Sequence, residues 1–294
     1  MDVVLVVIGL FISVYIACRI VVSFLFRKFL SRAKEKPPYD WNADGMTPEL
    51  CEILSHDGLK LRAKLFHQPE KTSDWVILVH GYTDNSDFMF EYANHYYKRC
   101  FNVLIPDMRG HGASEGMYIG MGWHDRLDLI RWTEYLLSRA PGAQVVLHGY
   151  SMGSATALMA GGEQLPSSVY CIVADSGYTT VADILAFQLK KRFNLPKFPF
   201  IFMGSRVARR HYGYSFYEAS TINKVKKVTI PIVFIHGSGD DFIPVQMTRD
   251  LYAAAQCTKE LLIVECEGHC TSHQEDPEAY WGTVDSFIET HRPV

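Results

Sequence analysis

The chain has 294 residues, of which 48% are hydrophobic and 21% charged, and its formal net charge is −3. A chain of this length and composition can bury one sizeable core. Lys and Arg are spread along the sequence and form no basic face, so nucleic-acid binding is not expected. The seven cysteines have no framework spacing, which indicates reduced thiols and argues against a disulfide scaffold.

The first segment is a long apolar run from Val3 to Phe26 that is interrupted by Arg19. About 20 apolar residues suffice for a helix to cross a bilayer, and an arginine near one end can extend to the interface. A cleaved signal peptide is less favoured, because no positive charge precedes the run and no A-x-A site follows it. We therefore predict a transmembrane anchor over residues 1–26, with an interfacial or partner-docking helix as the alternative.

Residues 27–45 form a basic and then proline-containing linker, with Pro37 and Pro38 in succession. Positive charges follow the apolar run, whereas none precedes it; those that follow are Arg27, Lys28, Arg32, Lys34 and Lys36. The positive-inside bias predicts a single-pass membrane protein whose folded part lies on the cytoplasmic side.

The rest of the chain, residues 46–294, alternates strand-like and helix-like runs. Residues 49–54 and 59–66 flank the turn His56-Asp57-Gly58, a pattern typical of a β-hairpin. Further on, β-branched runs are separated by helical stretches, which predicts a mostly parallel sheet with helices on both faces. The fold class that we expect is α/β.

An insert over about residues 178–226 interrupts this alternation before the strand-like run that begins near residue 230. Its aromatic and apolar side chains exceed what a connector needs; they are Phe187, Phe193, Phe198, Phe200, Phe202 and Met203. We expect either a small helical cap over the functional site or an insert that simply packs onto the domain, and the sequence leaves both open.

The most informative motif is Gly149-Tyr150-Ser151-Met152-Gly153. It reads G-x-S-x-G, with a short apolar β-branched run before it and a stretch of small, helix-compatible residues after it. This is the setting of a nucleophile elbow, in which a serine sits on a sharp turn from strand to helix with its hydroxyl exposed. Ser151 is therefore the candidate nucleophile.

A nucleophilic serine needs a base and a residue that orients the base, and the expected chain order is acid and then histidine. Asp240 follows the strand-like run at residues 232–235, and His269 follows the next strand-like run. Gly268 allows the tight turn that brings the His269 ring back over the serine. We predict a catalytic triad of Ser151, Asp240 and His269.

Other residues compete for these roles. Asp241 adjoins Asp240, but the D-x-x-I-P spacing fits Asp240. Asp175 ends an earlier strand-like run and is a weaker candidate for the acid. His273 and Cys270 lie close to the predicted base in sequence. We interpret His273 as a pocket-rim or surface residue and Cys270 as a packing residue.

The first oxyanion donor is expected after an early strand-like run, residues 75–79, where His80-Gly81-Tyr82 follows at once. Gly81 lets the backbone bend so that the Tyr82 N–H faces the developing oxyanion. The elbow exposes the Met152 N–H as the second donor. We predict that Tyr82 and Met152 form the oxyanion hole through their backbones.

Together these motifs resemble the α/β-hydrolase superfamily. Within it the sequence resembles bacterial membrane-anchored or serine-aminopeptidase-like (S33-type) hydrolases and relatives of monoacylglycerol lipase. The resemblance covers roughly residues 46–294 and rests on His80-Gly81-Tyr82, Asp107 through Ser114, Gly149 through Gly153, His236 through Pro244 and Gly268-His269. It implies the same triad and the same oxyanion donors.

This constellation predicts a membrane-anchored serine hydrolase that cleaves carboxylic esters, including lipid-like acyl substrates, through an acyl-enzyme. Amide, peptide and thioester bonds yield to the same machinery, so these activities stay open. A non-catalytic, membrane-tethered scaffold with a hydrolase fold is the alternative outside enzymes. The sequence contains no motif for a metal or a nucleotide, so no cofactor is expected.

Overall fold

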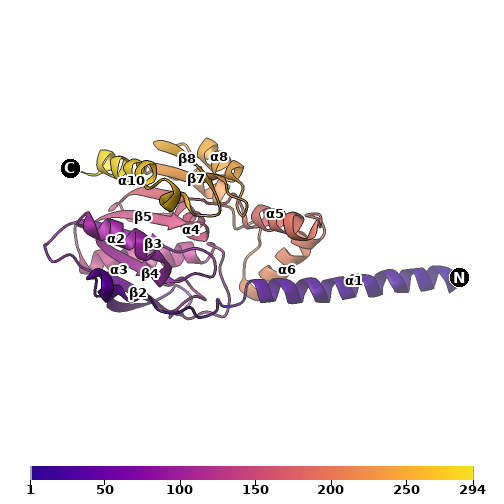
Figure 1. Ribbon diagram of the computed structural model, residues 1–294. Coiled ribbons are helices and arrows are strands. Elements are labelled where there is room, and N and C mark those ends of the chain that lie inside the picture. The colour runs from indigo at the N-terminus through magenta and orange to yellow at the C-terminus, as the bar shows by residue number, and fades with distance from the viewer. Residues whose placement is uncertain (1, 294) are drawn as a thin grey trace.

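An eight-stranded sheet forms the centre of the molecule (Figure 1). The computed structural model describes residues 2–293. The strands are β1 (Glu49–Leu54), β2 (Lys60–Phe66), β3 (Asp74–Val79), β4 (Asn102–Pro106), β5 (Gln144–Tyr150), β6 (Val169–Asp175), β7 (Ile232–Gly239) and β8 (Lys259–Glu267). Their order is β1-β2-β4-β3-β5-β6-β7-β8; β2 pairs antiparallel with β1 and β4, and the other pairs are parallel. The predicted α/β class with a mostly parallel sheet is confirmed.

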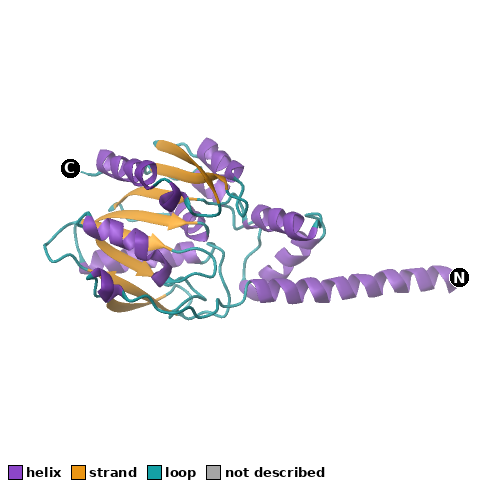
Figure 2. Ribbon diagram, in the orientation of Figure 1, coloured by secondary structure: helices purple, strands orange, loops and turns teal. Residues whose placement is uncertain are grey.

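Helices cover both faces of this sheet (Figure 2). They are α1 (Asp2–Phe29), α2 (Phe90–Lys98), α3 (Asp125–Arg139), α4 (Met152–Gly161), α5 (Val181–Phe193), α6 (Phe200–Tyr212), α7 (Thr221–Val225), α8 (Val245–Ala254), α9 (Ser272–Glu275) and α10 (Pro277–His291), with 3-10 turns at Trp41–Asp44 and Ser86–Met89. One apolar cluster joins the sheet to α2 and α10, and a second joins it to α3, α4, α7 and α8. The central strands are buried on both sides, which explains their continuous apolar runs.

A third apolar cluster lies beyond the sheet, and it packs α5 and α6 onto the outer side of α4. Met152, Ala155 and Met159 supply the α4 side of this cluster, and Ile184 and Ile201 come from α5 and α6. Residues 178–226, predicted as an insert, thus contain helices that lie beyond one end of the sheet, next to α1 (Figure 1).

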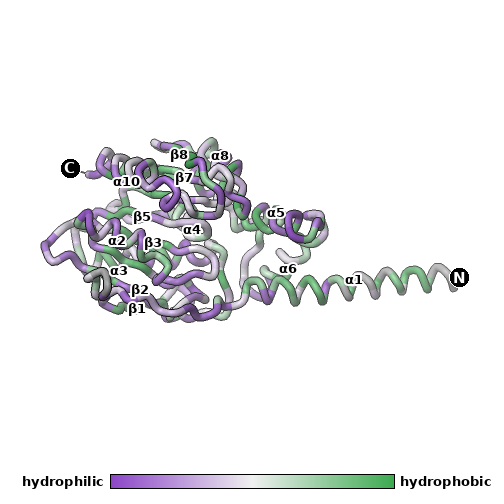
Figure 3. The backbone as a smooth tube through the Cα atoms, in the orientation of Figure 1, coloured by the Kyte–Doolittle hydropathy of each residue, from purple (hydrophilic) through white to green (hydrophobic). Residues whose placement is uncertain are grey.

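The N-terminal helix differs from its prediction. Among the residues that the structure describes, no helix is both long and apolar enough to cross a membrane. The transmembrane anchor expected over residues 1–26 is therefore not supported. Hydrophobic residues run along most of α1 where it projects from the body (Figure 3). Its last turns, however, pack onto the protein: Val22 is buried, and the Phe26 ring lies 5.4 Å from that of Phe216.

The segment after α1, which we predicted as a linker, is tied to the loop that follows β4. Leu30 is fully buried, and its carbonyl accepts the N–H of Ile119. The Arg32 guanidinium donates 2.6 Å hydrogen bonds to the carbonyls of Gly112 and Ser114. These contacts fix the end of α1 against the body of the molecule.

Candidate active site

Ser151 lies on the turn between the end of β5 and the start of α4, at φ 54° and ψ −119°. Non-glycine residues rarely adopt such a backbone, which persists only where the surrounding structure enforces it. A Cβ on Gly149 would lie 2.3 Å from the carbonyl carbon of Gly153, and a Cβ on Gly153 would lie 1.9 Å from the carbonyl oxygen of Val79. Strand and helix therefore cross too closely for any side chain at these two positions.

His269 and Asp240 reach Ser151 from the loops that follow β8 and β7. The His269 Nε2 atom lies 2.8 Å from the Ser151 hydroxyl oxygen, and Nδ1 lies 2.7 Å from a carboxylate oxygen of Asp240. Because the carboxylate accepts the proton on Nδ1, Nε2 is left to accept the proton of the serine hydroxyl. The structure thus brings all three predicted residues into one hydrogen-bonded chain.

A second histidine, His236, also contacts Asp240, and the sequence pattern gave no role to this residue. Its ring is fully buried, and Nε2 lies 3.1 Å from the Asp240 carboxylate. Burial raises the pKa of Asp240, but hydrogen bonds from His236 and His269 outweigh this effect and hold the pKa well below its ordinary value. The carboxylate is therefore ionised near neutral pH. The only signal in the sequence was that His236 lies four residues before the acid, in the second half of β7.

The competing acids are engaged elsewhere. The Asp241 side chain is 78% exposed and forms an ion pair with Lys191. Asp175 is buried, and its carboxylate accepts hydrogen bonds from the hydroxyls of Ser176 and Tyr280. The geometry therefore favours Asp240 over both alternatives as the partner of the histidine.

The competing histidine and thiol occupy different surroundings. His273 contacts the Tyr92 hydroxyl through Nδ1 and the Glu91 carboxylate through Nε2, so both of its ring nitrogens are engaged. The Cys270 sulfur lies 3.4 Å from His269 Nε2, close enough to touch the site. Burial raises the pKa of the Cys270 thiol well above its ordinary value, so the thiol stays protonated and poorly nucleophilic.

The two expected oxyanion donors flank the serine. Tyr82 follows β3, Met152 begins α4, and both residues line the same cavity as Ser151 and His269. The Tyr82 side chain turns to the N-terminal segment: its hydroxyl donates a 2.6 Å hydrogen bond to the carbonyl of Phe29. Burial raises the pKa of Tyr82 to about 12, so this hydroxyl remains a neutral donor.

This cavity has a volume of about 700 Å³ and is mainly apolar. Side chains of α1, α5 and the loop after β7 form its walls, among them Leu25, Phe29, Leu185, Leu189, Phe193 and Phe242. A few polar groups also line the cavity: Thr83, Asp84, Gln188, Arg192 and Asp241. A cavity of this size and character suits a small organic substrate with an apolar part.

The sequence of this chain is similar to those of known proteins. The sequence pattern of the α/β hydrolase fold family matches residues 74–206. The chain is 30% identical to YqkD of Bacillus subtilis over 222 residues, which cover 75% of this chain and 73% of YqkD. It is 25% identical to YfhR of Escherichia coli K12 over 291 residues, which cover 96% of this chain and 86% of YfhR. The chain belongs to the α/β-hydrolase superfamily.

Solved structures of this superfamily share the fold. An esterase of Pyrococcus furiosus superposes with a TM-score of 0.75 at 22% identity, covering 90% of this chain and 99% of the esterase. An acylaminoacyl peptidase of Pyrococcus horikoshii superposes with a TM-score of 0.66 at 17% identity, covering 86% of this chain and 44% of the peptidase. The narrower resemblance to S33-type hydrolases and monoacylglycerol-lipase relatives stays a prediction.

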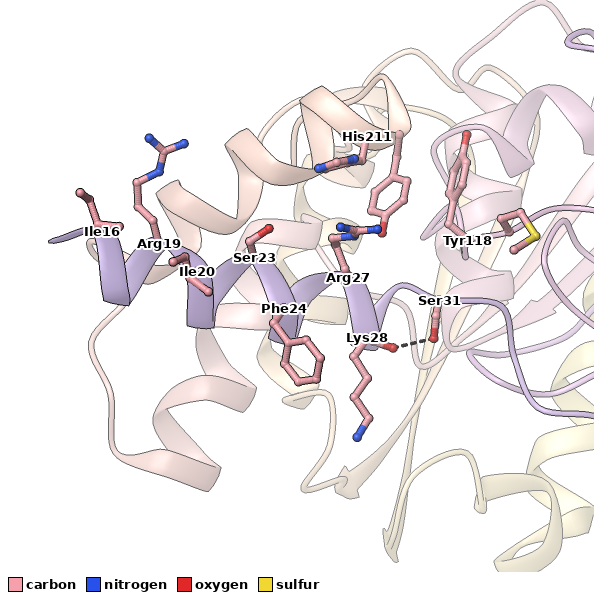
Figure 4. A pocket seen from close by; sticks show the side chains of 12 residues that line it. Ile16, Arg19, Ile20, Ser23, Phe24, Arg27, Lys28, Ser31, Tyr118 and His211 are labelled. Carbon is pink, nitrogen blue, oxygen red and sulfur yellow. Dashed lines mark hydrogen bonds between the residues drawn. The ribbon is translucent and has the colours of Figure 1, made fainter. Parts of the chain in front are cut away.

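In this α/β hydrolase a second hollow, of about 1080 Å³, lies between α1, α6 and residues 117–118. It is lined by the cations Arg19, Arg27 and Lys28 beside apolar residues of α1. Figure 4 shows Arg27 extending towards the end of α6, where His211 lies. The lining residues do not include Ser151, so α1 separates a basic hollow from the apolar cavity of the active site.

One group of side chains in the described part of the hydrolase has the composition of a metal site. His56, Asp57 and Asp128 offer ligand atoms that lie within 4.8 Å of one another. The buried Arg109 guanidinium forms ion pairs with both carboxylates, at 2.9 Å to Asp57 and 2.6 Å to Asp128. A cation is thus already present among these acids, which explains the cluster as an ion-pair network that holds the loop after β4.

Proposed function

We propose that this protein is a serine hydrolase that cleaves carboxylic esters through an acyl-enzyme. The observation that carries the proposal is the pair of hydrogen bonds that link Ser151 to His269 and His269 to Asp240. Ser151 and His269 line a mainly apolar cavity. The fold that this chain shares with the esterase of Pyrococcus furiosus supports the same reaction class.

In the first half of the reaction, the Ser151 oxygen attacks the ester carbonyl carbon while His269 Nε2 takes the serine proton. The ionised Asp240 holds the His269 tautomer and stabilises the imidazolium that forms. The Tyr82 and Met152 N–H groups would receive the negative oxygen of the tetrahedral intermediate. The bond from carbon to the leaving oxygen then breaks, and His269 returns its proton to the alcohol that departs.

In the second half, water takes the place of the serine hydroxyl as nucleophile. His269 accepts a proton from water as the hydroxide oxygen bonds to the acyl carbon of the Ser151 ester. The second tetrahedral intermediate collapses, the Ser151 oxygen leaves with the proton from His269, and the carboxylic acid is released. All of these proton transfers use side chains of this chain.

The test compares Ser151→Ala with the unmodified protein. A fluorophosphonate probe should label the unmodified protein and fail to label the variant, and p-nitrophenyl acetate hydrolysis should follow the same pattern. Equal labelling of both proteins would overturn Ser151 as the nucleophile. The substrate panel also holds aminoacyl amides and acyl thioesters. If the probe labels Ser151 and the protein hydrolyses one of these but no ester, the activated serine acts on that bond. A protein that neither reacts with the probe nor turns over any substrate would fit a scaffold.

We also propose that α1 associates with an anionic lipid surface. Support comes from its exposed apolar side chains, which include Leu5, Val6, Leu10, Ile12, Ile16 and Ile20, and from the adjacent basic hollow. Such a combination binds lipid through apolar burial and attraction to anionic headgroups. The protein should co-sediment with phosphatidylglycerol vesicles more than with phosphatidylcholine vesicles. The difference should shrink in a variant that carries Gln at Arg19, Arg27 and Lys28, and equal binding by both vesicle types would overturn the proposal.

We also propose that the folded part lies on the cytoplasmic side, because the anionic lipids of the cytoplasmic leaflet attract the basic residues that follow the apolar run. Protease added to intact cells should then spare the hydrolase domain. Ready cleavage of that domain from outside would place it on the other side.

A further inference from the structure

We propose that the last turns of α1 form a wall of the substrate cavity and set the length of the apolar chain that the enzyme accepts. This inference rests on the proposed ester hydrolysis and names its substrate class: esters that carry an apolar acyl chain. A segment that the sequence marks as a separate anchor thereby becomes part of the binding site.

The first observation is the lining of the cavity. Leu25 and Phe29 of α1 line the same volume of about 700 Å³ as Ser151 and His269. Side chains of α5 supply further apolar lining, among them Leu189. An acyl chain that leaves the carbonyl carbon at Ser151 therefore meets apolar side chains from both helices. Burying one methylene in such a cavity raises kcat/KM roughly fourfold if the gain reaches the transition state.

The second observation is that this end of α1 is held in place. A Cβ on Gly204 of α6 would lie 2.4 Å from the Phe26 ring, so the small residue makes room for that ring. Phe26 also packs against Phe216, and Leu30, one residue past the helix, is fully buried. A wall that is fixed by such packing can define a cavity length, whereas a freely moving helix would not.

The third observation connects this wall to the catalytic loop. The rings of Phe29 and Tyr82 stack with centroids 4.9 Å apart and an interplanar angle of 19°. The Tyr82 hydroxyl donates to the Phe29 carbonyl at 2.6 Å. Farther along, Lys36 pairs with Asp84, which accepts a 2.6 Å hydrogen bond from Tyr150 beside the nucleophile. The N-terminal segment thus touches the loop of the first oxyanion donor at two places.

Two adjacent residues of α1 provide a matched pair for the test. Leu25 lines the active-site cavity, whereas Phe24 lines the basic hollow (Figure 4). Both side chains are largely exposed, at 55% and 65%, so neither substitution removes a core residue. A change of size at Leu25 alters the cavity, and the same change at Phe24 does not.

The experiment measures kcat/KM of the full chain for p-nitrophenyl esters from acetate to dodecanoate, below micelle-forming concentrations. In Leu25→Trp the added bulk shortens the cavity, so the ratio of decanoate to acetate should fall at least tenfold. Leu25→Ala lengthens the cavity and should move the optimum to a longer chain. Phe24→Trp should keep the chain-length profile of the unmodified protein.

Opposite shifts from the two Leu25 variants, together with an unchanged Phe24→Trp profile, are the expected result. Identical profiles in Leu25→Trp and Phe24→Trp would overturn the inference while leaving ester hydrolysis in place. If the unmodified protein hydrolyses no ester and Ser151 takes up no fluorophosphonate, the proposed function itself has failed, and the inference falls with it. Because the two Leu25 variants act in opposite directions, misfolding of one does not imitate the result.

Discussion

The elbow around Ser151 and the helix α1 contrast in how the sequence encodes them. At the elbow, the steric requirement falls on one stretch of five residues: two glycines allow the close crossing of strand and helix, and the serine lies on the turn between them. At α1, the role depends on contacts with distant residues such as Tyr82 and Phe216. Local steric requirements leave a pattern in the sequence, whereas an apolar run looks alike whether it meets lipid, a protein core or a substrate.

The largest effect expected lies at the elbow. Ser151→Ala should lower kcat/KM for esters by several orders of magnitude and keep the fold, because the side chain is small and the turn is set by the glycines. His269→Ala should cost a similar amount, and the double variant should cost little more, since members of a triad act as a unit. Steady-state kinetics on p-nitrophenyl butyrate check this, and near-normal turnover by Ser151→Ala would remove the assignment.

The next effect distinguishes the two adjacent acids. Asp240→Asn should lower kcat by about 10³–10⁴, since loss of the carboxylate favours the wrong histidine tautomer. Asp241→Asn should stay near the activity of the unmodified protein, because the Asp241 side chain points to solvent and pairs with Lys191. Measuring kcat of both variants at equal folded concentration checks this. A larger loss of kcat in Asp241→Asn than in Asp240→Asn would make Asp241 the acid of the triad.

A third effect concerns a buried carboxyl in the first turn of α3. Asp125 begins α3 and is fully buried; its burial raises the pKa from an ordinary 3.8 to about 7. The folded state therefore holds a proton that the unfolded chain releases near pH 4. Protonation of Asp125 therefore favours the folded state. This stabilising effect is fully present below pH 4, declines as the pH rises, and is lost above about pH 7.

Urea unfolding at pH 5 and pH 8.5 checks this sign. The free energy of unfolding should fall between these pH values by up to about 3 kcal/mol from this group, at 1.36 kcal/mol per pKa unit. Asp125→Asn cannot release a proton, so its free energy of unfolding should lose this part of the pH dependence. Asp87→Asn is the control, since it removes a carboxylate that is paired with Lys64. The same slope in all three proteins would contradict the pKa of Asp125.

These expectations separate what the sequence revealed from what it did not. The strands of the sheet and the choice of Asp240 over Asp241 followed from short patterns, because each depends on residues that are close in sequence. The order of serine, acid and histidine followed from the pattern of the superfamily. The contact of His236 with Asp240 was missed, because a single buried histidine in a strand has no pattern of its own. The packing of Phe26 and Phe29 was missed for a related reason: α6 and the oxyanion loop lie far away in the sequence.

A fourth prediction divides α1 itself. Removal of residues 2–18 should leave kcat/KM for p-nitrophenyl acetate within about twofold, because that part of α1 projects from the body (Figure 3) and its apolar side chains, such as Leu5, Leu10 and Ile16, are exposed. Removal of residues 2–30 should lower it about tenfold or more and lower the Tm, since Phe26, Phe29 and Leu30 leave the wall and its core. Equal activity of both truncated proteins would show that α1 contributes nothing to the active site.

The smallest effect expected tests the hydrogen bond between the Tyr82 hydroxyl and the end of α1. Tyr82→Phe keeps the ring that stacks on Phe29 and removes only the hydroxyl that donates to the Phe29 carbonyl. A neutral hydrogen bond of this kind contributes about 1 kcal/mol, so the free energy of unfolding should fall by about that amount.

If the bond also positions the backbone of residue 82, kcat should fall severalfold while KM changes little, because the oxyanion forms only on the way to the transition state. Tyr97→Phe is the control, since it removes a tyrosine hydroxyl of α2 that donates to a backbone carbonyl, that of His67, at 3.2 Å, and Tyr97 does not line the cavity. A loss of stability in both variants with a loss of kcat only in Tyr82→Phe would show that α1 acts on catalysis through this contact, and equal kcat in the two variants would restrict the contact to holding the helix.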